Sequence, residues 1–268
     1  EFTVLAFNDS EMSIIEDMQH NGINVELMPM MSLRNIRAFY QFLKGFFETH
    51  RFNIVHSHFP QIDNIVFRLA RKNSNTVCIS HSHSVKLSEF PLRAIRNRIM
   101  CLGINRTADC FGACSVNAGK CLYGNSFTRN PKALLIKNGI ITEKFRFKPQ
   151  IRTLLKKELG IDDNSIVLGH VGSFKPVKNQ IFLVHVLSNL LKRNNKYRLV
   201  FIGDGDTIND VKREALRLNC GNNILFLGSV SNVSDYLNIF DAYVMPSLHE
   251  GLGISAIEAE TNGLPCFL

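Results

Sequence analysis

Apolar residues in this chain fall into two kinds of run, which alternate from one end to the other. Short runs rich in β-branched and aromatic residues predict strands at 2–7, 23–28, 53–56, 76–80, 110–114, 133–136, 166–171, 198–202, 224–227 and 242–245. Runs with helical periodicity predict helices at 10–19 (capped by Ser10), 33–50, 62–72, 91–102, 116–123, 152–159, 180–191, 208–218 and 233–239. This alternation predicts the α/β class, with parallel sheets covered by helices on both faces.

One interruption divides the pattern into two similar halves. Asn138-Gly139 is a turn signal, and the stretch 144–150 that follows it is irregular and basic. We therefore predict two Rossmann-like domains, at residues 1–140 and 141–268.

Composition limits the class of protein in two ways. No apolar run approaches the roughly 20 residues needed to cross a membrane, and the chain opens on a strand rather than on a signal peptide. Seven cysteines, an odd number without metal-site spacing, indicate reduced thiols in a cytoplasmic protein.

Charge is concentrated in the first half of the chain. The formal net charge is +8, and residues 1–137 carry 16 Lys and Arg against 10 Asp and Glu. Such an excess suggests an anionic partner. A nucleic acid is not expected, since no recognised nucleic-acid motif is present and Trp is absent. An anionic membrane surface remains a candidate partner, because the basic helix predicted at 91–102 carries Arg93, Arg96 and Arg98 among apolar residues. The alternative is an ordinary domain helix with a solvated face.

The stretch 246–265, PSLHEGLGISAIEAETNGLP, carries the clearest chemistry. It follows an apolar strand and places Glu250, Gly251 and Gly253 in a turn before a helix that contains Glu258. Exposed backbone N–H groups and a helix N-terminus make an anion site, and a nearby carboxylate suits the hydroxyls of a ribose or sugar. An equally good interpretation of Glu258 is structural, because Ser255-x-x-Glu258 matches a helix capping box.

A second candidate anion site follows the strand predicted at 166–171. The segment from Gly172 to Asn179 opens a helix and contains Lys178, whose charge opposes the helix dipole unless an anion binds there. The common alternative is an exposed loop lysine. Gly203-Asp204-Gly205, after the next strand, indicates a tight turn.

Two histidine pairs end neighbouring strands of the first half. His56 and His58 end one strand, and His81 and His83 end the next. Ligands gather at the carboxyl ends of parallel strands, so these side chains should face one cleft. Zinc is the rival interpretation, but no cysteine or carboxylate completes a metal site, and we expect none.

The stretch 246–265 resembles a known family. Its E-G-L-G-x-x-x-x-E, followed by E-x-x-x-x-G-L-P, is similar to the signature of the retaining, nucleotide-sugar-dependent glycosyltransferases of family 4 (group 1), which have the GT-B fold. The subgroup it resembles builds bacterial capsular polysaccharides and exopolysaccharides.

The resemblance implies roles for particular residues. Glu250 would lie beside the donor sugar and phosphates, Glu258 would bind the ribose, and the amides of Gly251, Leu252 and Gly253 would hold the diphosphate. The family has G-R-x-x-x-x-K at Gly172 to Lys178, and here Ser173 replaces the arginine, so that position lacks its charge. Further positions match as follows: Gly203 beside the nucleotide, Val230 near the base, His81 facing the donor sugar and phosphate, and His56, His58 and His83 on the acceptor side.

The resemblance also implies an activity. The chain would transfer a sugar, with retention, from a UDP- or GDP-linked donor to a saccharide or lipid-linked acceptor, with His81, Lys178 and Glu250 as catalytic residues and no cofactor. It would act in the cytoplasm or at the inner face of the membrane. The alternatives are a nucleotide-sugar epimerase of the same fold and an inactive nucleotide-binding scaffold. Compared with the family, we expect a first βα unit before Phe2 and further elements after Leu268.

Overall fold

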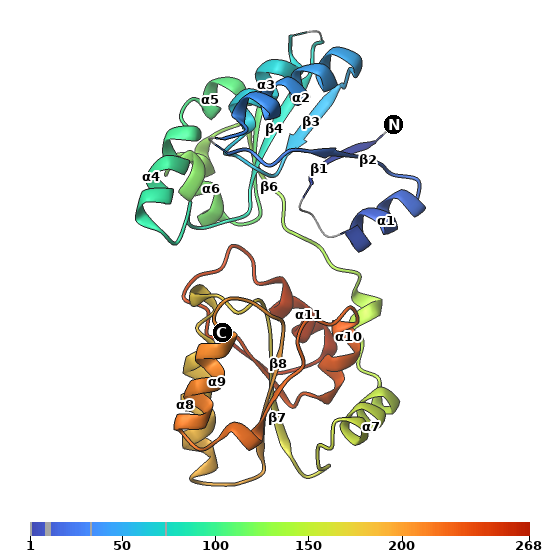
Figure 1. Cartoon of the computed structure of the whole chain (residues 1–268), viewed down its shortest axis with the longest axis vertical. Coiled ribbons are helices and arrows are strands. Elements are labelled where there is room, and N and C mark those ends of the chain that lie inside the picture. The colour runs from blue at the N-terminus through green and yellow to red at the C-terminus, as the bar shows by residue number, and fades with distance from the viewer. Residues whose placement is uncertain (1, 9–11, 33, 73) are drawn as a thin grey trace. The chain divides into compact units, whose positions relative to one another are not determined.

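The computed structural model describes residues 2–8, 12–32, 34–72 and 74–268, and the chain divides into two compact units, Glu1–Ile136 and Lys137–Leu268 (Figure 1). The boundary falls a few residues before the predicted one. The predicted cap Ser10 lies outside the described residues. Every strand pair in both units is parallel, as the α/β pattern predicts.

The first unit is built on a four-stranded sheet in the order β3-β4-β5-β6, with β1 and β2 forming a separate pair. Its strands are β1 (Thr3–Phe7), β2 (Asn24–Met28), β3 (Ile54–Ser57), β4 (Val77–Ser82), β5 (Cys110–Ala113) and β6 (Ala133–Leu135). Its α-helices are α1 (Met12–His20), α2 (Ile36–Thr49), α3 (Asp63–Ala70), α4 (Pro91–Met100), α5 (Ile104–Thr107) and α6 (Val116–Tyr123). Helix α2 shows how sequence sets packing, since Phe39, Leu43, Phe46 and Phe47 recur at helical spacing and are all buried.

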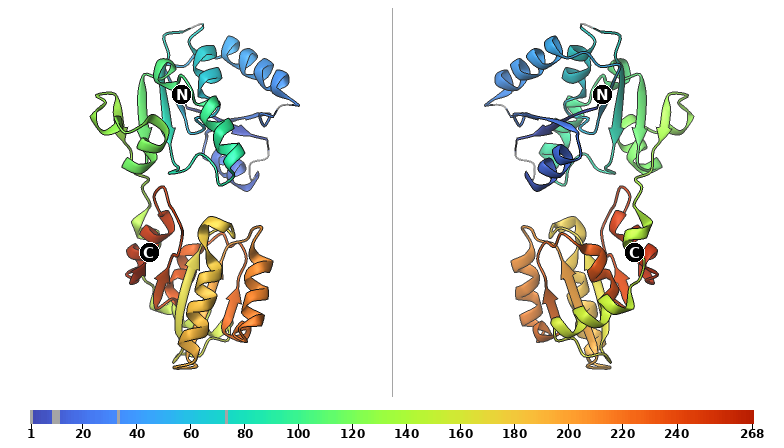
Figure 2. Two further views of the ribbon diagram at one scale, coloured as in Figure 1. Left: turned by 90° about the vertical axis from the view of Figure 1, so that its left-hand side faces the viewer. Right: turned by 90° about the vertical axis from the view of Figure 1, so that its right-hand side faces the viewer.

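The second unit is a five-stranded sheet in the order β11-β10-β7-β8-β9. Its strands are β7 (Ile166–Val171), β8 (Tyr197–Ile202), β9 (Ile224–Phe226), β10 (Ala242–Val244) and β11 (Cys266–Phe267). Its α-helices are α7 (Pro149–Glu158), α8 (Gln180–Leu191), α9 (Ile208–Arg217), α10 (Val233–Tyr236) and α11 (Ile254–Asn262). Helices α8 and α9 cover one face of the sheet, and α7, α10 and α11 cover the other, each over its own apolar core. Figure 2 shows α8 in front of the sheet in its left panel and α7 in front in its right panel.

Several elements differ from the prediction at their ends. Strand β4 runs on to Ser82 and so includes His81, and the predicted helix 91–102 stops at Met100 before a separate turn of helix, α5. Helix α7 begins at Pro149, three residues earlier than predicted, because Pro is well suited to a first helical turn. A short strand that we did not predict, β11, pairs with β10.

An arginine–aspartate pair recurs at the same place in both units. Asp109 precedes β5 and Asp241 precedes β10, and each carboxylate accepts the N–H of the second residue of the neighbouring strand, Cys78 or Val167, at 2.8 Å. Each also pairs with an arginine, Arg71 at the C-terminal end of α3 or Arg152 in α7. That arginine in turn donates to backbone carbonyls just before the aspartate. The pair thus ties a helix to the start of two adjacent strands.

Candidate functional site

Strand β10 leads into α11 through the turn that the sequence singled out. Helix α11 begins at Ile254, with Gly253 at its N-cap and no side-chain cap. Within the described part of the chain, the N–H groups of Gly251, Leu252 and Gly253 donate no hydrogen bond. Unpaired amides at a helix start leave donors free for an anion.

The capping-box interpretation of Glu258 is wrong. Because α11 starts at Ile254, Ser255 is already inside the helix, and its hydroxyl accepts a hydrogen bond from the Tyr243 hydroxyl at 2.8 Å. Glu258 lies a turn further on, and among the described residues it has no hydrogen-bond or ion-pair partner. Partial burial raises the pKa of its carboxyl group. A half-buried carboxylate without a partner is available to a ligand hydroxyl.

Lys178 and Glu250 form an ion pair, although 72 residues separate them in the chain. Lys178 Nζ lies 2.6 Å from Glu250 Oε1, with 19% and 26% of the two side chains exposed. Lys178 ends the 3-10 helix Pro176–Lys178 and precedes α8, whose bounds are those predicted. The carboxylate holds the ammonium in place and offsets its charge.

The loops after β7, β8 and β9 are bonded to one another through their backbones. Gly172 N–H donates to Ile202 O at 2.9 Å, and Gly203 N–H donates to Gly228 O at 2.8 Å. Gly203 has φ +130°, and a Cβ there would collide with the Gly172 carbonyl. The amides of Gly172 and Gly203 are therefore used within the protein, and these glycines allow the loops to approach each other.

Two further predicted donor residues lie in the same unit. Ser173 accepts a hydrogen bond at its carbonyl oxygen from Gln180 Nε2 at 2.9 Å. Val230 packs, partly buried, against the core formed with α7 and α11. Their roles toward a donor stay predictions.

His170 was missed by the sequence reasoning. It lies in β7, is fully buried, and its Nδ1 is 2.8 Å from Val244 O. Burial lowers the pKa of His170 to about 4, and the charges of Lys178 and Glu250 also act on it. The available signal was a polar residue inside an otherwise apolar strand.

The four histidines of the first unit come together at the ends of β3 and β4, which are adjacent and parallel. His56 Nε2 lies 3.1 Å from His81 Nδ1, and His58 Nδ1 lies 2.7 Å from His83 Nε2. Burial, together with the neighbouring rings, lowers the pKa of His81 to about 4, and burial also lowers the pKa values of the other three. At neutral pH this group, which we call the histidine cluster, is uncharged.

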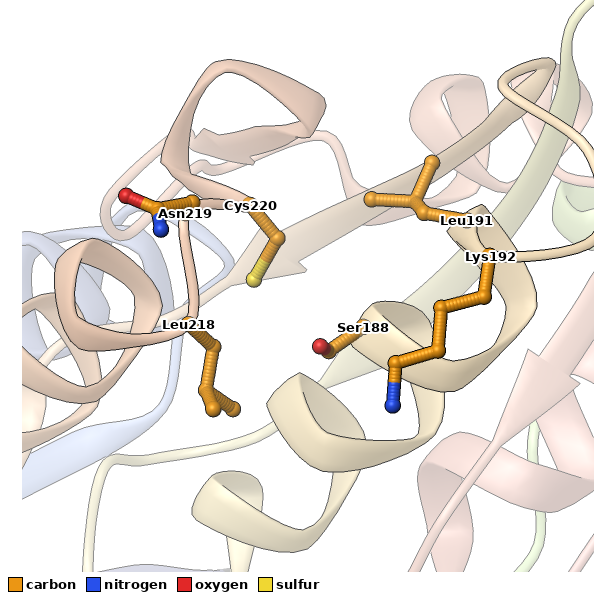
Figure 3. Close-up of a pocket in the computed structure, with 6 residues that line it drawn as sticks. All are labelled: Ser188, Leu191, Lys192, Leu218, Asn219 and Cys220. Atoms are coloured by element: carbon orange, nitrogen blue, oxygen red, sulfur yellow. The ribbon is translucent and has the colours of Figure 1, made fainter.

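A pocket elsewhere in the second unit involves none of these residues. It is lined by Ser188, Leu191, Lys192, Leu218, Asn219 and Cys220 (Figure 3). These residues lie at the C-terminal ends of α8 and α9, where the chain is about to re-enter the sheet. The candidate site, in contrast, lies where the strands end.

Known proteins agree with this architecture. Residues 151–268 match the family model described as glycosyl transferases group 1. A protein named glycosyltransferase EpsF, from Bacillus subtilis, is 29% identical over all of this chain and 71% of its own length. UDP-Gal:alpha-D-GlcNAc-diphosphoundecaprenol alpha-1,3-galactosyltransferase of Escherichia coli is 26% identical over 91% of this chain, which spans 63% of that relative.

Two more comparisons bear on the family and the fold. The capsular polysaccharide biosynthesis glycosyltransferase CapH of Staphylococcus aureus is 26% identical over 97% of this chain and 70% of its own length. The crystal structure of HepE from Anabaena, in complex with UDP and glucose, superposes with a TM-score of 0.79 at 19% identity, covering 98% of this chain and 72% of that one. The predicted GT-B fold is thereby confirmed. Residues 151–268 thus match the group 1 glycosyl transferase model, within a chain that has the GT-B fold and a relative named as a glycosyltransferase of capsular polysaccharide biosynthesis.

Proposed function

We propose that this chain transfers a sugar, with retention, from a nucleotide-diphosphate donor to a saccharide or lipid-linked acceptor, as a family 4 enzyme of capsule or exopolysaccharide synthesis. One observation carries the proposal. At the end of β10, the unpaired amides of Gly251, Leu252 and Gly253 lie one helical turn before Glu258, a half-buried carboxylate without a partner. Free donors beside a free acceptor suit a ligand that has both phosphates and hydroxyls.

Within this proposal, the leaving diphosphate is the group that the protein must stabilise. The three amides and Lys178 donate hydrogen bonds to it as negative charge develops, and they need little reorganisation because the turn and the Glu250 ion pair hold them. Ser173 adds a neutral contact where the family has arginine. The part of the site that holds the nucleotide is bounded by Gly172, Gly203 and Val230.

UDP is the donor nucleotide to test first, ahead of GDP. The name of the Escherichia coli relative specifies UDP-Gal, and HepE was crystallised with UDP and glucose. The diphosphoundecaprenol in the former name also supports a lipid-linked acceptor. The seven cysteines form no disulfide, which fits a reducing cytoplasmic location.

The histidine cluster supplies the remaining proposed roles. We assign His81 to the donor sugar and phosphate, and His56, His58 and His83 to the acceptor side. An uncharged His81 can donate or accept a hydrogen bond without repelling a cationic transition state, which suits glycosyl transfer. The scheme itself requires neither a metal nor a cofactor.

Replacing Glu258 tests the nucleotide site. We expect Glu258→Ala to weaken UDP binding by about 1–3 kcal/mol, because the ribose loses hydrogen bonds to a charged group. Glu260→Ala is the matched control, since Glu260 is an exposed carboxylate on the same helix. Titration calorimetry gives the affinities and thermal unfolding gives the stabilities. Unchanged UDP affinity in Glu258→Ala would remove the ribose assignment.

Product analysis separates the transferase from its rivals. Incubation with UDP-sugars should release UDP together with free sugar or glycosylated acceptor. A UDP-sugar recovered with altered stereochemistry would indicate the epimerase, and tight binding without any turnover would indicate the inactive scaffold.

A further inference from the structure

The histidine cluster has the spacing of a metal site. One ring nitrogen from each of His56, His58 and His81 lies within 4.8 Å of the other two. Zinc–nitrogen bonds of 2.0–2.1 Å place two ligands of a tetrahedron about 3.3 Å apart. His56 Nε2 and His81 Nδ1 are already 3.1 Å apart, so small side-chain rotations would complete a three-nitrogen face.

A fourth histidine supports this face from outside. His83 Nε2 lies 2.7 Å from His58 Nδ1, which leaves His58 Nε2 as the free nitrogen of that ring. Metal-binding histidines commonly donate their second N–H to such a partner, which fixes the tautomer and the ring orientation. The His83 ring also stacks on His81, with ring centres 4.1 Å apart.

The surroundings of His81 point the same way. Its side chain is only 2% exposed, and within the described residues its Nε2 has a weak interaction with the backbone of Ile136 as its one other polar contact. Nδ1, the nitrogen that faces His56 Nε2, is therefore the one available to a metal. The four histidine rings have few polar partners other than one another. A cation that draws their lone pairs together would satisfy several of them at once.

We propose that His56, His58 and His81 bind one divalent transition-metal ion of the zinc class, with His83 as the outer partner of His58. Three imidazoles suit Zn²⁺, Co²⁺, Ni²⁺ or Cu²⁺ and not Mg²⁺ or Ca²⁺. A fourth position stays open to water or another ligand. One consequence rests on the proposed function: the ion takes up His81, so it should inhibit sugar transfer, and a chelator should restore it.

The test is titration of the full chain with ZnCl2 in the absence of any nucleotide, with CoCl2 absorbance as a report on ligand geometry. We expect one ion per chain and a tetrahedral Co²⁺ spectrum. His58→Ala and His56→Ala should each weaken Zn²⁺ binding more than tenfold, and His83→Gln should weaken it about tenfold, as the loss of an outer partner does. His56 and His58 are exposed, so these variants should keep the wild-type melting temperature.

His20→Ala is the matched control, because His20 is an exposed histidine outside the cluster. Wild-type protein that binds no Zn²⁺, or Zn²⁺ affinity that survives His58→Ala and His56→Ala, would overturn the proposal. UDP titration separates the two hypotheses. Wild-type protein that binds UDP but no Zn²⁺ contradicts the metal site alone, and wild-type protein that binds Zn²⁺ but no UDP contradicts the proposed transferase alone.

Discussion

Individual buried groups without partners are the most informative residues in this chain. Glu258 has none, and the two side-chain oxygens of Asp63 are buried without a well-formed hydrogen bond. Asp63 begins α3, is fully buried, and is only partly compensated by the hydroxyls of Ser57 and Ser80. Burial raises the pKa of Asp63 to about 7. Glu258 lies beside the candidate site, where a ligand could donate hydrogen bonds to it. Asp63 lies in the interior of the first unit.

Asp63 should make the stability of the first unit depend on pH. Its folded pKa lies above the unfolded value, so the folded state holds the extra proton, and stability is lost as pH rises from about 4 to about 7. The loss should be up to about 1.4 kcal/mol per pH unit, and Asp63→Asn should abolish it. Urea unfolding at several pH values measures the slope.

The exposed Asp17 supplies the control for that measurement. Asp17→Asn should leave the slope as it is in the wild-type protein. An Asp63→Asn variant that keeps the wild-type slope would show that another group titrates in this range.

At the scale of elements, the starts of the strands carry stabilising contacts and the ends of the strands carry candidate functional residues. Strand ends carry the candidate chemistry, in the histidine cluster and in the turn before α11. Strand starts carry the two arginine–aspartate pairs, which fix a helix against adjacent strands in each unit. The same device in both units provides stability at the edge away from the candidate sites.

Breaking one pair should destabilise its unit. Asp241→Ala leaves Arg152 without its carboxylate and Val167 N–H without an acceptor, which should cost about 1–3 kcal/mol of unfolding free energy. Asp210→Ala removes a surface pair with Arg213 and should cost about 0.2–1 kcal/mol. Denaturant unfolding compares the two. Equal costs would mean that the pair before β10 is an ordinary surface contact.

At the scale of the whole molecule, helix α4 presents an unusual combination of exposed apolar and basic side chains. Helix α4 buries only Asn97, while Leu92, Ile95 and Ile99 are 82%, 59% and 61% exposed and lie beside Arg93, Arg96 and Arg98. Among the described residues, no helix is long and apolar enough to cross a bilayer. Apolar and basic side chains on one exposed helix suit a helix lying on an anionic membrane.

Membrane binding should therefore depend on those arginines. Replacing Arg93, Arg96 and Arg98 with Gln should reduce binding to phosphatidylserine vesicles, because each basic residue contributes about 1 kcal/mol near the surface, and added salt should have the same effect. Cosedimentation measures it, and UDP affinity should not change. Replacing Lys192, Arg193 and Lys196, exposed in the second unit, is the control. Wild-type protein that ignores these vesicles at low salt would contradict membrane binding.

The sequence-based prediction was correct for features that depend on residues close together in the chain. Periodicity placed β7, α8 and α6 at their observed bounds, because the chain-local pattern of apolar residues decides which face is buried. The meeting of the histidine pairs was also predictable, since sequential strands in parallel sheets are usually neighbours and their carboxyl ends share an edge.

The remaining features depend on contacts between distant segments. Whether Ser255 caps a helix depends on where α11 begins, and α11 begins at Ile254, two residues earlier than a Ser255 cap requires. Lys178 and Glu250 pair although they are far apart in sequence, and Gly203 is required because the distant Gly172 carbonyl lies against it. The burial of His170 and Asp63 likewise depends on segments that are distant in the chain. The sequence by itself thus determined the elements and the candidate chemistry, because periodicity and turn signals are local. Only the tertiary structure decided which donors, acceptors and charges are left without partners, because that depends on what folds against them.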